Sequence, residues 1–288
     1  MQYYEFENGV RIPMVGLGTF PLKGAVLSAT IINAVNVGYE LFDTAAGYNN
    51  EKEIGDLVNE GVLLPDRVFL TSKVHSSILI GRRRYFHLDR KSVRKAYLES
   101  CKRLHLQKLG AYLLHMPFDG CSKHYCDLMQ LYDDEMVNVI GVSNFDIREL
   151  KELKKKCGRW PMMNQTELSP YNTQKELIQF CQDHGILVQA YSPFGRGNLV
   201  QEIMHEKNLL SIANGHGKTV GQIVLRFIVQ QGVAVVARSS NNDRMKANID
   251  IFDFILSEDE MLTISSLNRN VVFGVNQINK YNKKEVII

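Results

Sequence analysis

Short and almost continuously apolar runs alternate with longer amphipathic stretches along most of this chain. The runs lie at residues 14–18, 39–43, 68–73, 110–115, 137–142, 162–166, 187–191 and 233–237. Continuous apolar runs are typical of parallel strands that helices cover on both faces. The stretches between them, among them 92–106, 147–156, 173–184 and 218–231, carry apolar residues at helical spacing. The pattern therefore predicts eight strands and roughly eight helices in alternation.

Glycines mark where several of these elements end. Gly185 and Gly232 follow two of the helical stretches directly, where a left-handed residue commonly ends a helix. The chain opens with two extended pieces, 2–6 and 10–13, joined through Asn8-Gly9. Asn-Gly between extended runs is a strong hairpin signal, so we expect an N-terminal β-hairpin ahead of the alternating units.

Eight strand–helix units in a chain of 288 residues have the size and rhythm of a TIM barrel. A doubly wound open sheet is the alternative, but the turn after its first strand normally carries three glycines, and the segment GLGTFP at 16–21 lacks the third. We see no linker, internal repeat or change of composition. We therefore predict one α/β domain over residues 1–288, a TIM (β/α)8 barrel whose bottom the hairpin caps.

The composition narrows the class of partner. A net charge of +3 is too weak to indicate nucleic acid or a membrane surface, so we expect neither as a partner. The five cysteines contain no CxxC pair, so we expect reduced thiols and a cytoplasmic protein. The N-terminal segment has no signal-peptide pattern, and no apolar run reaches the roughly 18 residues of a membrane span.

Polar residues end nearly every predicted strand. In such a barrel the reactive groups lie at the C-terminal ends of the strands. The residues at those ends are Asp43, Lys73, His115, Ser143, Asn144, Gln165, Tyr191, Ser192, Arg238, Ser239 and Ser240. One alone would more often be a helix cap or a structural histidine, although a buried lysine needs a partner for its charge. Their occurrence together at one rim favours an active site.

Asp43, Tyr48, Lys73 and His115 form a set that is suited to carbonyl reduction. A free tyrosine has a pKa of about 10, and a nearby ammonium lowers it. Asp43 could hold the ammonium of Lys73, and His115 could orient a carbonyl oxygen. Such a tyrosine can act as a general acid, whereas the hydride must come from a cofactor because no side chain donates one. The small-molecule carbonyl substrate that we expect as the partner is indicated by these reactive side chains and not by the charge.

The segments that carry these residues resemble the aldo-keto reductases. They are GLGTF (16–20), DTAAGYNNE (43–51), TSK (71–73), LLHMP (113–117), IGVSNF (140–145), MNQTELSPY (163–171), AYSPFGRG (190–197) and RSSNNDRMKAN (238–248). The resemblance covers about residues 2–270 and is nearest the short prokaryote-like and protozoan members, which include diketogluconate reductases and prostaglandin F synthases. It implies an NAD(P)H-dependent oxidoreductase on a TIM barrel, with monomer as the common form.

The resemblance also implies roles for single residues. Tyr48 would donate the proton, tuned by Lys73 with Asp43 behind it, while His115 and Phe20 would contact the substrate. The implied cofactor contacts are Gly18, Thr19, Asp43, Ser143, Asn144, Gln165, Tyr191, Ser192, Arg238, Ser239, Ser240, Arg244 and Asn248. Among these, Tyr191 would stack on the nicotinamide. Two guanidiniums suit the 2′-phosphate, so NADPH is expected rather than NADH, and no metal is expected.

The sequence departs from the family pattern in places. Val-Ala-Arg-Ser stands at 236–239 where Ile-Pro-Lys-Ser is usual, Ala247 replaces a glutamate and His75 a tryptophan, and the basic loop 76–91 and the tail after Asn270 differ. That loop and tail set substrate choice in the family, so the sequence does not name a substrate.

Three other functions are alternatives. A cofactor-binding sensor or regulatory subunit with little turnover could share the same barrel. A metal-dependent hydrolase would use His75, His115 and Asp43, but no HxH pair follows the first strand. A phosphate-loop NTPase is disfavoured because the glycine needed five residues before Gly217 is Ile212. The Gly217-Lys218-Thr219 segment is instead predicted to start a helix.

Overall fold

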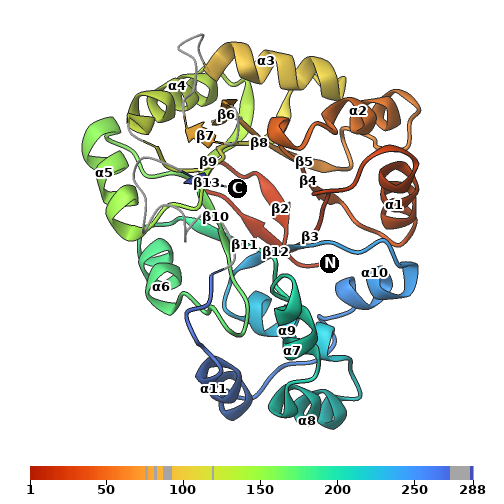
Figure 1. Cartoon of the computed structure of the whole chain (residues 1–288). Helices are drawn as coiled ribbons and strands as arrows, with labels where there is room; N and C mark the ends of the chain where they lie inside the picture. Colours follow the sequence, from red (N-terminus) through yellow and green to blue (C-terminus); the bar gives the residue numbers. More distant parts are fainter. Residues whose placement is uncertain (75–76, 81–82, 87–92, 119, 273–285, 288) are drawn as a thin grey trace.

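Eight parallel strands close into a barrel in the computed structural model, which describes residues 1–74, 77–80, 83–86, 93–118, 120–272 and 286–287 (Figure 1). The strands are β3 (Val15–Gly18), β4 (Leu41–Asp43), β5 (Phe69–Val74), β8 (Leu109–Leu114), β9 (Val137–Ser143), β10 (Met163–Glu167), β11 (Leu187–Tyr191) and β12 (Ala234–Ala237). They follow one another around the barrel in chain order, and β12 pairs with β3 to close it. The predicted TIM barrel is confirmed.

Helices form a ring around the strands, as Figure 1 shows. They are α1 (Gly24–Asn36), α2 (Glu51–Asn59), α3 (Val93–Leu104), α4 (Cys121–Asp133), α5 (Ile147–Cys157), α6 (Lys175–Asp183), α7 (Asn198–Met204), α8 (Lys207–His216), α9 (Val220–Gln230), α10 (Asn242–Ile249) and α11 (Glu258–Ser266). The described residues thus form eleven α-helices where roughly eight were expected, because three helices separate β11 from β12 and α11 follows α10. Within the same residues, every helix is too short or too polar to cross a bilayer.

Local signals in the sequence set the helix ends. Thr219 starts α9 through a capping box with Gln222, which confirms a helix start after Gly217-Lys218. Gly185 and Gly232 have φ angles of +67° and +74°, directly after the C-caps of α6 and α9. These left-handed conformations favour glycine and confirm the predicted helix ends.

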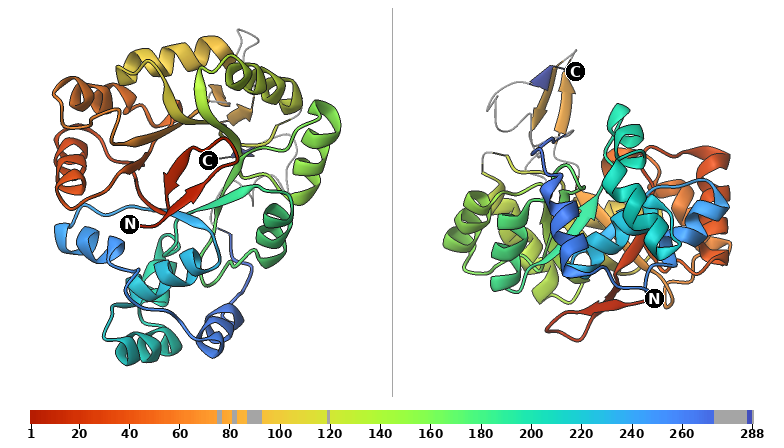
Figure 2. Two further views of the ribbon diagram at one scale, coloured as in Figure 1. Left: turned by 180° about the vertical axis from the view of Figure 1, so that it is seen from behind. Right: turned by 90° about the horizontal axis from the view of Figure 1, so that it is seen from below.

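The two ends of the barrel carry different additions, as Figure 2 shows. β1 (Tyr3–Glu5) and β2 (Arg11–Pro13) pair as the predicted N-terminal hairpin at one end. At the other end, β6 (Ser77–Ile80), β7 (Arg83–Phe86) and β13 (Val286–Ile287) form a small antiparallel sheet. Part of the unusual 76–91 loop therefore pairs with the end of the tail, which sequence analysis did not predict. The rest of that loop and of the tail beyond residue 272 lies outside the described residues, as does His75.

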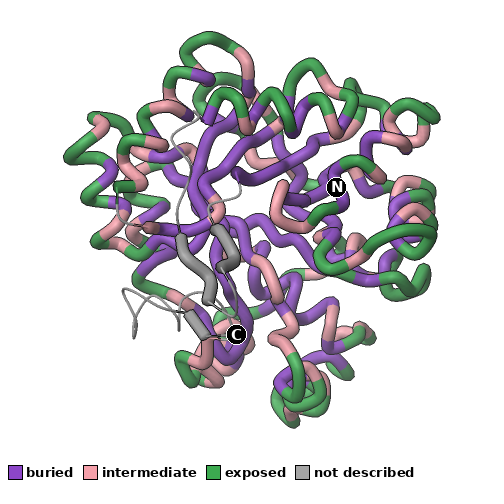
Figure 3. Tube along the Cα trace, turned by 45° about the horizontal axis from the view of Figure 1, so that its top comes forward, coloured by how far each residue is buried: buried purple, intermediate pink, exposed green. Residues whose placement is uncertain are grey.

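The barrel strands are the most deeply buried part of the chain, as Figure 3 shows, whereas the helices alternate buried and exposed positions. Val15, Leu17, Leu41 and Phe42 on the first two barrel strands are fully buried. Gly16 lies between them, and an added Cβ there would come within 2.4 Å of the Leu41 side chain. Only glycine allows β3 to approach β4 this closely.

Candidate active site

A buried ion pair joins β4 to β5 at the C-terminal end of the barrel. Lys73 Nζ donates to both carboxylate oxygens of Asp43, at 2.8 and 2.7 Å, and to the carbonyl oxygen of Thr44 at 2.9 Å. Both charged side chains are buried. An isolated charge at this depth would cost several kcal/mol, so each group depends on the other.

Tyr48 lies beside this pair on a short 3-10 turn, η1 (Ala46–Tyr48). Its Oη is 3.5 Å from Lys73 Nζ, and the ammonium is 5.1 Å from the centre of the Tyr48 ring. Asn50 fixes the loop, since its side chain accepts from Thr44 Oγ1 at 2.6 Å and donates to Thr19 Oγ1 at 3.2 Å. The phenol is therefore held next to a permanent positive charge.

Burial decides the protonation state of Tyr48. Burial raises its pKa above the ordinary value, the ammonium of Lys73 opposes that rise, Asp43 adds to it, and Arg196 opposes it. Lys73 therefore acts in the expected direction, but burial outweighs it, so the expected net lowering of the pKa does not occur. At neutral pH the phenol keeps its proton, as a proton donor must.

Lys73 keeps its charge in spite of its burial. Burial alone would lower the pKa of Lys73, but the charge and hydrogen bonds of Asp43 and Tyr48 outweigh this and raise it. The positive charge beside Tyr48 is therefore present at neutral pH, and it can stabilise a phenolate once the proton has left.

Two further rings contact Tyr48. The His115 ring, directly after β8, lies 5.5 Å from the Tyr48 ring in an edge-on arrangement. The Phe20 ring lies 5.0 Å from it and is half exposed. The three residues predicted to contact a substrate thus lie together, with Phe20 reaching toward solvent.

An amide network connects this set to the neighbouring strands. Gln165 on β10 donates from Nε2 to Asp43 Oδ1 at 2.7 Å and to Gln189 Oε1 at 2.6 Å. Asn144 follows β9 and donates from Nδ2 to Ser143 Oγ at 3.0 Å and to the carbonyl oxygen of His115 at 3.2 Å. The residues expected to hold a nicotinamide therefore adjoin those expected to reduce a carbonyl.

Tyr191 and Ser192 belong to the same rim. The Tyr191 hydroxyl donates to Asn144 Oδ1 at 2.6 Å, and its ring lies 5.4 Å below the Arg196 guanidinium. Arg196 also donates from Nε to Ser192 Oγ at 2.8 Å. Its charge opposes the rise that burial causes in the pKa of Tyr48. Sequence analysis did not single out Arg196, although it lies in the segment AYSPFGRG (190–197) that contributes to the family resemblance.

The residues expected at the 2′-phosphate gather around the start of α10. Arg238, Ser240 and Arg244 are exposed there. Ser239 is buried, and its Oγ accepts from the N–H of Asn241, the residue that caps α10. Exposed guanidiniums beside a helix N-terminus suit a phosphate.

Three other predicted cofactor residues differ in their surroundings. An added Cβ at Gly18 would meet no atom within 4 Å, so the rim beside the end of β3 has room for a ligand. Thr19 is buried, and its hydroxyl donates to the Asp43 carbonyl oxygen at 2.9 Å. Asn248 is also buried. The Thr19 hydroxyl is therefore engaged in a hydrogen bond within the protein, and Asn248 is enclosed by its neighbours.

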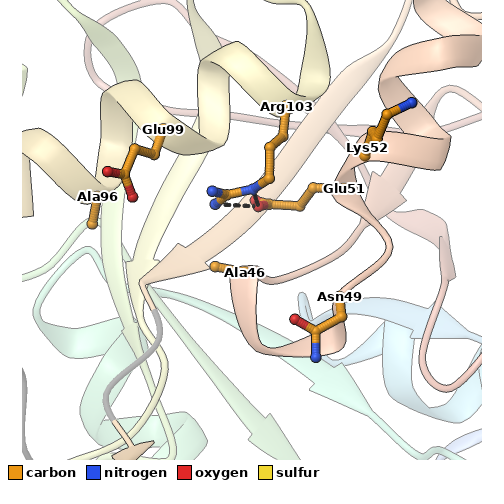
Figure 4. A pocket seen from close by; sticks show the side chains of 7 residues that line it. All are labelled: Ala46, Asn49, Glu51, Lys52, Ala96, Glu99 and Arg103. Atoms are coloured by element: carbon orange, nitrogen blue, oxygen red, sulfur yellow. Dashed lines mark hydrogen bonds and ion pairs between the residues drawn. The ribbon is translucent and has the colours of Figure 1, made fainter.

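Sequence analysis missed a buried network behind the site, which Figure 4 shows in part. The Glu51 carboxylate accepts from Ser72 Oγ at 2.5 Å, and from Arg103 Nε at 2.7 Å. Glu51 comes three residues after Tyr48, and Ser72 directly precedes Lys73, so their bond ties the two segments together. The network lies at a pocket of about 510 Å³ outside the barrel. Its lining residues are Ala46, Asn49, Glu51, Lys52, Ala96, Glu99 and Arg103.

Comparison with known proteins places this geometry in one family. Residues 15–269 match the family described as the Aldo/keto reductase family. The chain is 36% identical to the glyoxal reductase of Bacillus subtilis, over 94% of this chain and 95% of that protein. It is 31% identical to the NADH-dependent D-xylose reductase of Candida parapsilosis, over 94% and 93%. The structure of a Bombyx mori aldo-keto reductase in complex with NADP superposes with a TM-score of 0.84 at 28% identity, covering 98% of each chain.

Proposed function

The chain belongs to the aldo/keto reductase family, and we propose that it reduces small aldehydes or ketones to alcohols with NADPH as the electron donor. The observation that carries this proposal is the contact of Lys73 with Tyr48. A half-buried, protonated phenol beside a buried, charged ammonium can give up its proton, and the ammonium can stabilise the phenolate that remains.

Each residue of the site has its own role in the proposed reaction. NADPH, when bound, supplies a hydride to the carbonyl carbon. Tyr48 donates its proton to the carbonyl oxygen, so that an alcohol is formed. Lys73 stabilises the phenolate, and Asp43 holds the ammonium in place. His115, whose ring lies 5.5 Å from that of Tyr48, donates a hydrogen bond to the same carbonyl oxygen and orients it.

The residues at the rim fit a nicotinamide dinucleotide. In this proposal Ser143, Asn144 and Gln165 bind the carboxamide, and Tyr191 stacks on the nicotinamide ring. In this proposal Gly18, beside which the space is open, and Thr19 also contact the cofactor. Ser192 contacts the pyrophosphate.

The preference for NADPH rests on the start of α10. Arg238 and Arg244 are exposed there and can bind a 2′-phosphate, with Ser239, Ser240 and Asn248 beside them. The NADP complex of the Bombyx mori relative supports this choice, whereas the Candida parapsilosis relative uses NADH. The two guanidiniums of this chain favour the phosphorylated cofactor.

The test is the consumption of NADPH and of NADH, followed by nicotinamide absorbance, against a panel of small aldehydes, diketones and sugar-derived ketones. We expect turnover with NADPH at a higher kcat/KM than with NADH. Tight NADPH binding with no turnover on any carbonyl of the panel would contradict the proposal and favour a cofactor-binding sensor.

A further inference from the structure

Two cysteines meet on the outer helix ring, between α4 and α5, which lie side by side in Figure 1. Cys126 is an exposed residue of α4, and Cys157 is the last residue of α5. The Cys126 thiol donates to the Cys157 sulfur, and the two sulfurs are 2.7 Å apart. A disulfide bond is about 2.05 Å long, so forming it requires less than about 1 Å of movement.

The surroundings give the two thiols different roles. Cys157 is half-buried and donates to the carbonyl oxygen of Ser122 at 3.1 Å, which turns its sulfur toward α4. Burial, together with the neighbouring Cys126, raises the pKa of Cys157 to about 12, so it remains a thiol at neutral pH. Cys126 is exposed and is therefore the sulfur that a dissolved oxidant reaches first.

We propose that Cys126 and Cys157 are an oxidation site that forms a disulfide between α4 and α5 when the protein meets a peroxide. Cys126 attacks one oxygen of hydrogen peroxide, and its sulfur becomes a sulfenic acid while one water leaves. The Cys157 sulfur then attacks the Cys126 sulfur and gives its thiol proton to the departing hydroxide, so that the S–S bond forms and a second water leaves. The two thiols lose two electrons and two protons in all, and both go to the peroxide. A dithiol reductant reverses the reaction.

The disulfide would close a segment that belongs to the barrel. The cysteines are 31 positions apart, and the chain between them includes β9 and the rim residues Ser143 and Asn144. Closing such a loop restricts the unfolded chain, which raises the stability of the folded one. The oxidised protein is expected to melt on the order of 5 °C above the reduced protein.

The test is mass spectrometry of the full chain after treatment with hydrogen peroxide and digestion without reductant. We expect one cross-linked pair of peptides, containing Cys126 and Cys157, which a dithiol separates. The cross-link should disappear in Cys126→Ser and persist in the control Cys101→Ser, whose cysteine is buried on α3. The rise in Tm should disappear in Cys126→Ser as well.

Cys121 offers a second check, because it lies at the start of the same helix as Cys126. The Cys126–Cys157 cross-link should form unchanged in Cys121→Ser. A cross-link through Cys121 in the wild type would overturn the proposal. Sulfinic acid at Cys126 with no cross-link would also overturn it. A cross-linked protein whose Tm is no higher than that of the reduced protein would overturn it as well.

Discussion

Gln165 Nε2 donates a hydrogen bond of 2.7 Å to the same Asp43 carboxylate that holds Lys73. This contact crosses the barrel, since Asp43 ends β4 and Gln165 lies on β10. It links a residue proposed to bind the nicotinamide to the pair that sets the charge beside Tyr48. A movement of Gln165 would therefore be felt by Lys73, and through it by Tyr48, because both Gln165 and Lys73 bind the Asp43 carboxylate.

Removing the Tyr48 hydroxyl tests the proton donor. Tyr48→Phe should lower kcat by about 10²–10⁴-fold, because a positioned general acid contributes that much. NADPH affinity, measured by fluorescence titration, should change little, since the ring remains. Carbonyl reduction at the wild-type rate in this variant would exclude Tyr48 as the donor.

The buried ion pair predicts a non-additive double mutant. Lys73→Met leaves the Asp43 carboxylate buried without its ammonium, so the free energy of unfolding should fall by about 3–5 kcal/mol. The double variant Lys73→Met/Asp43→Asn removes both charges and should lose less than the sum of the single variants. Urea denaturation of the four proteins gives the coupling free energy. An additive result would mean that the two charges do not depend on each other.

The start of α10 predicts cofactor preference. Arg244→Ala should weaken NADPH binding by about 10- to 100-fold, the loss of a charge-assisted contact, and NADH binding by much less. Titration of each cofactor measures the ratio. Lys246→Ala on the same helix is the matched control and should affect neither. Equal weakening of both cofactors by Arg244→Ala would place the 2′-phosphate elsewhere.

The network of Glu51, Ser72 and Arg103 behind the site predicts a variant that loses both stability and catalytic rate. Arg103→Met removes a charged donor from the buried Glu51 carboxylate, which keeps its hydrogen bond from Ser72, and should cost about 1–3 kcal/mol of unfolding free energy. It should also lower kcat, because Glu51 and Ser72 tie the Tyr48 and Lys73 segments together. Arg94→Met on the same helix breaks an exposed pair with Asp134 and should cost much less than Arg103→Met, because solvent screens that pair. Equal losses for the two variants would argue against the network.

Glu149 predicts a pH dependence of stability. Burial raises its pKa to about 7 from an ordinary value near 4.5. The folded state then binds the proton more tightly than the unfolded state, so this stabilisation is complete below about pH 4.5 and is lost as the pH rises through 7. Between these values the free energy of unfolding should fall by on the order of 1 kcal/mol. Glu149→Gln, which can still accept from the Asp146 N–H, should show a flatter profile in urea melts at several pH values.

The rim of the site could be predicted from sequence because parallel strands end at one edge. Asp43, Lys73 and Gln165 each follow or end an apolar run, so a barrel brings them together whatever the details of its helices. Ser72 gave no such signal. It alternates with Lys73 on β5 and faces the helix layer, where its partner Glu51 comes from α2. Nothing in the local pattern indicates that pairing.

Two other features needed the structure for different reasons. Proximity to Lys73 predicted one influence on the pKa of Tyr48, but the larger influence is burial, which depends on how the whole rim packs. The pairing of β7 with β13 joins residues about two hundred positions apart. Neither strand carries a sequence pattern that indicates its partner, so sequence periodicity alone does not predict their sheet.

The closure of the barrel through β12 and β3 has a consequence for how the enzyme is made. Asp43 and Lys73 lie on β4 and β5, whereas the strand that completes the barrel around them, residues 234–237, comes about 160 positions after Lys73 in the chain. Without β12 the sheet edge on β3 has no partner strand, and the barrel around the buried charges stays open. A chain that ends before β12 is therefore expected to lack the enclosed Asp43–Lys73 pair rather than to keep a partly active site.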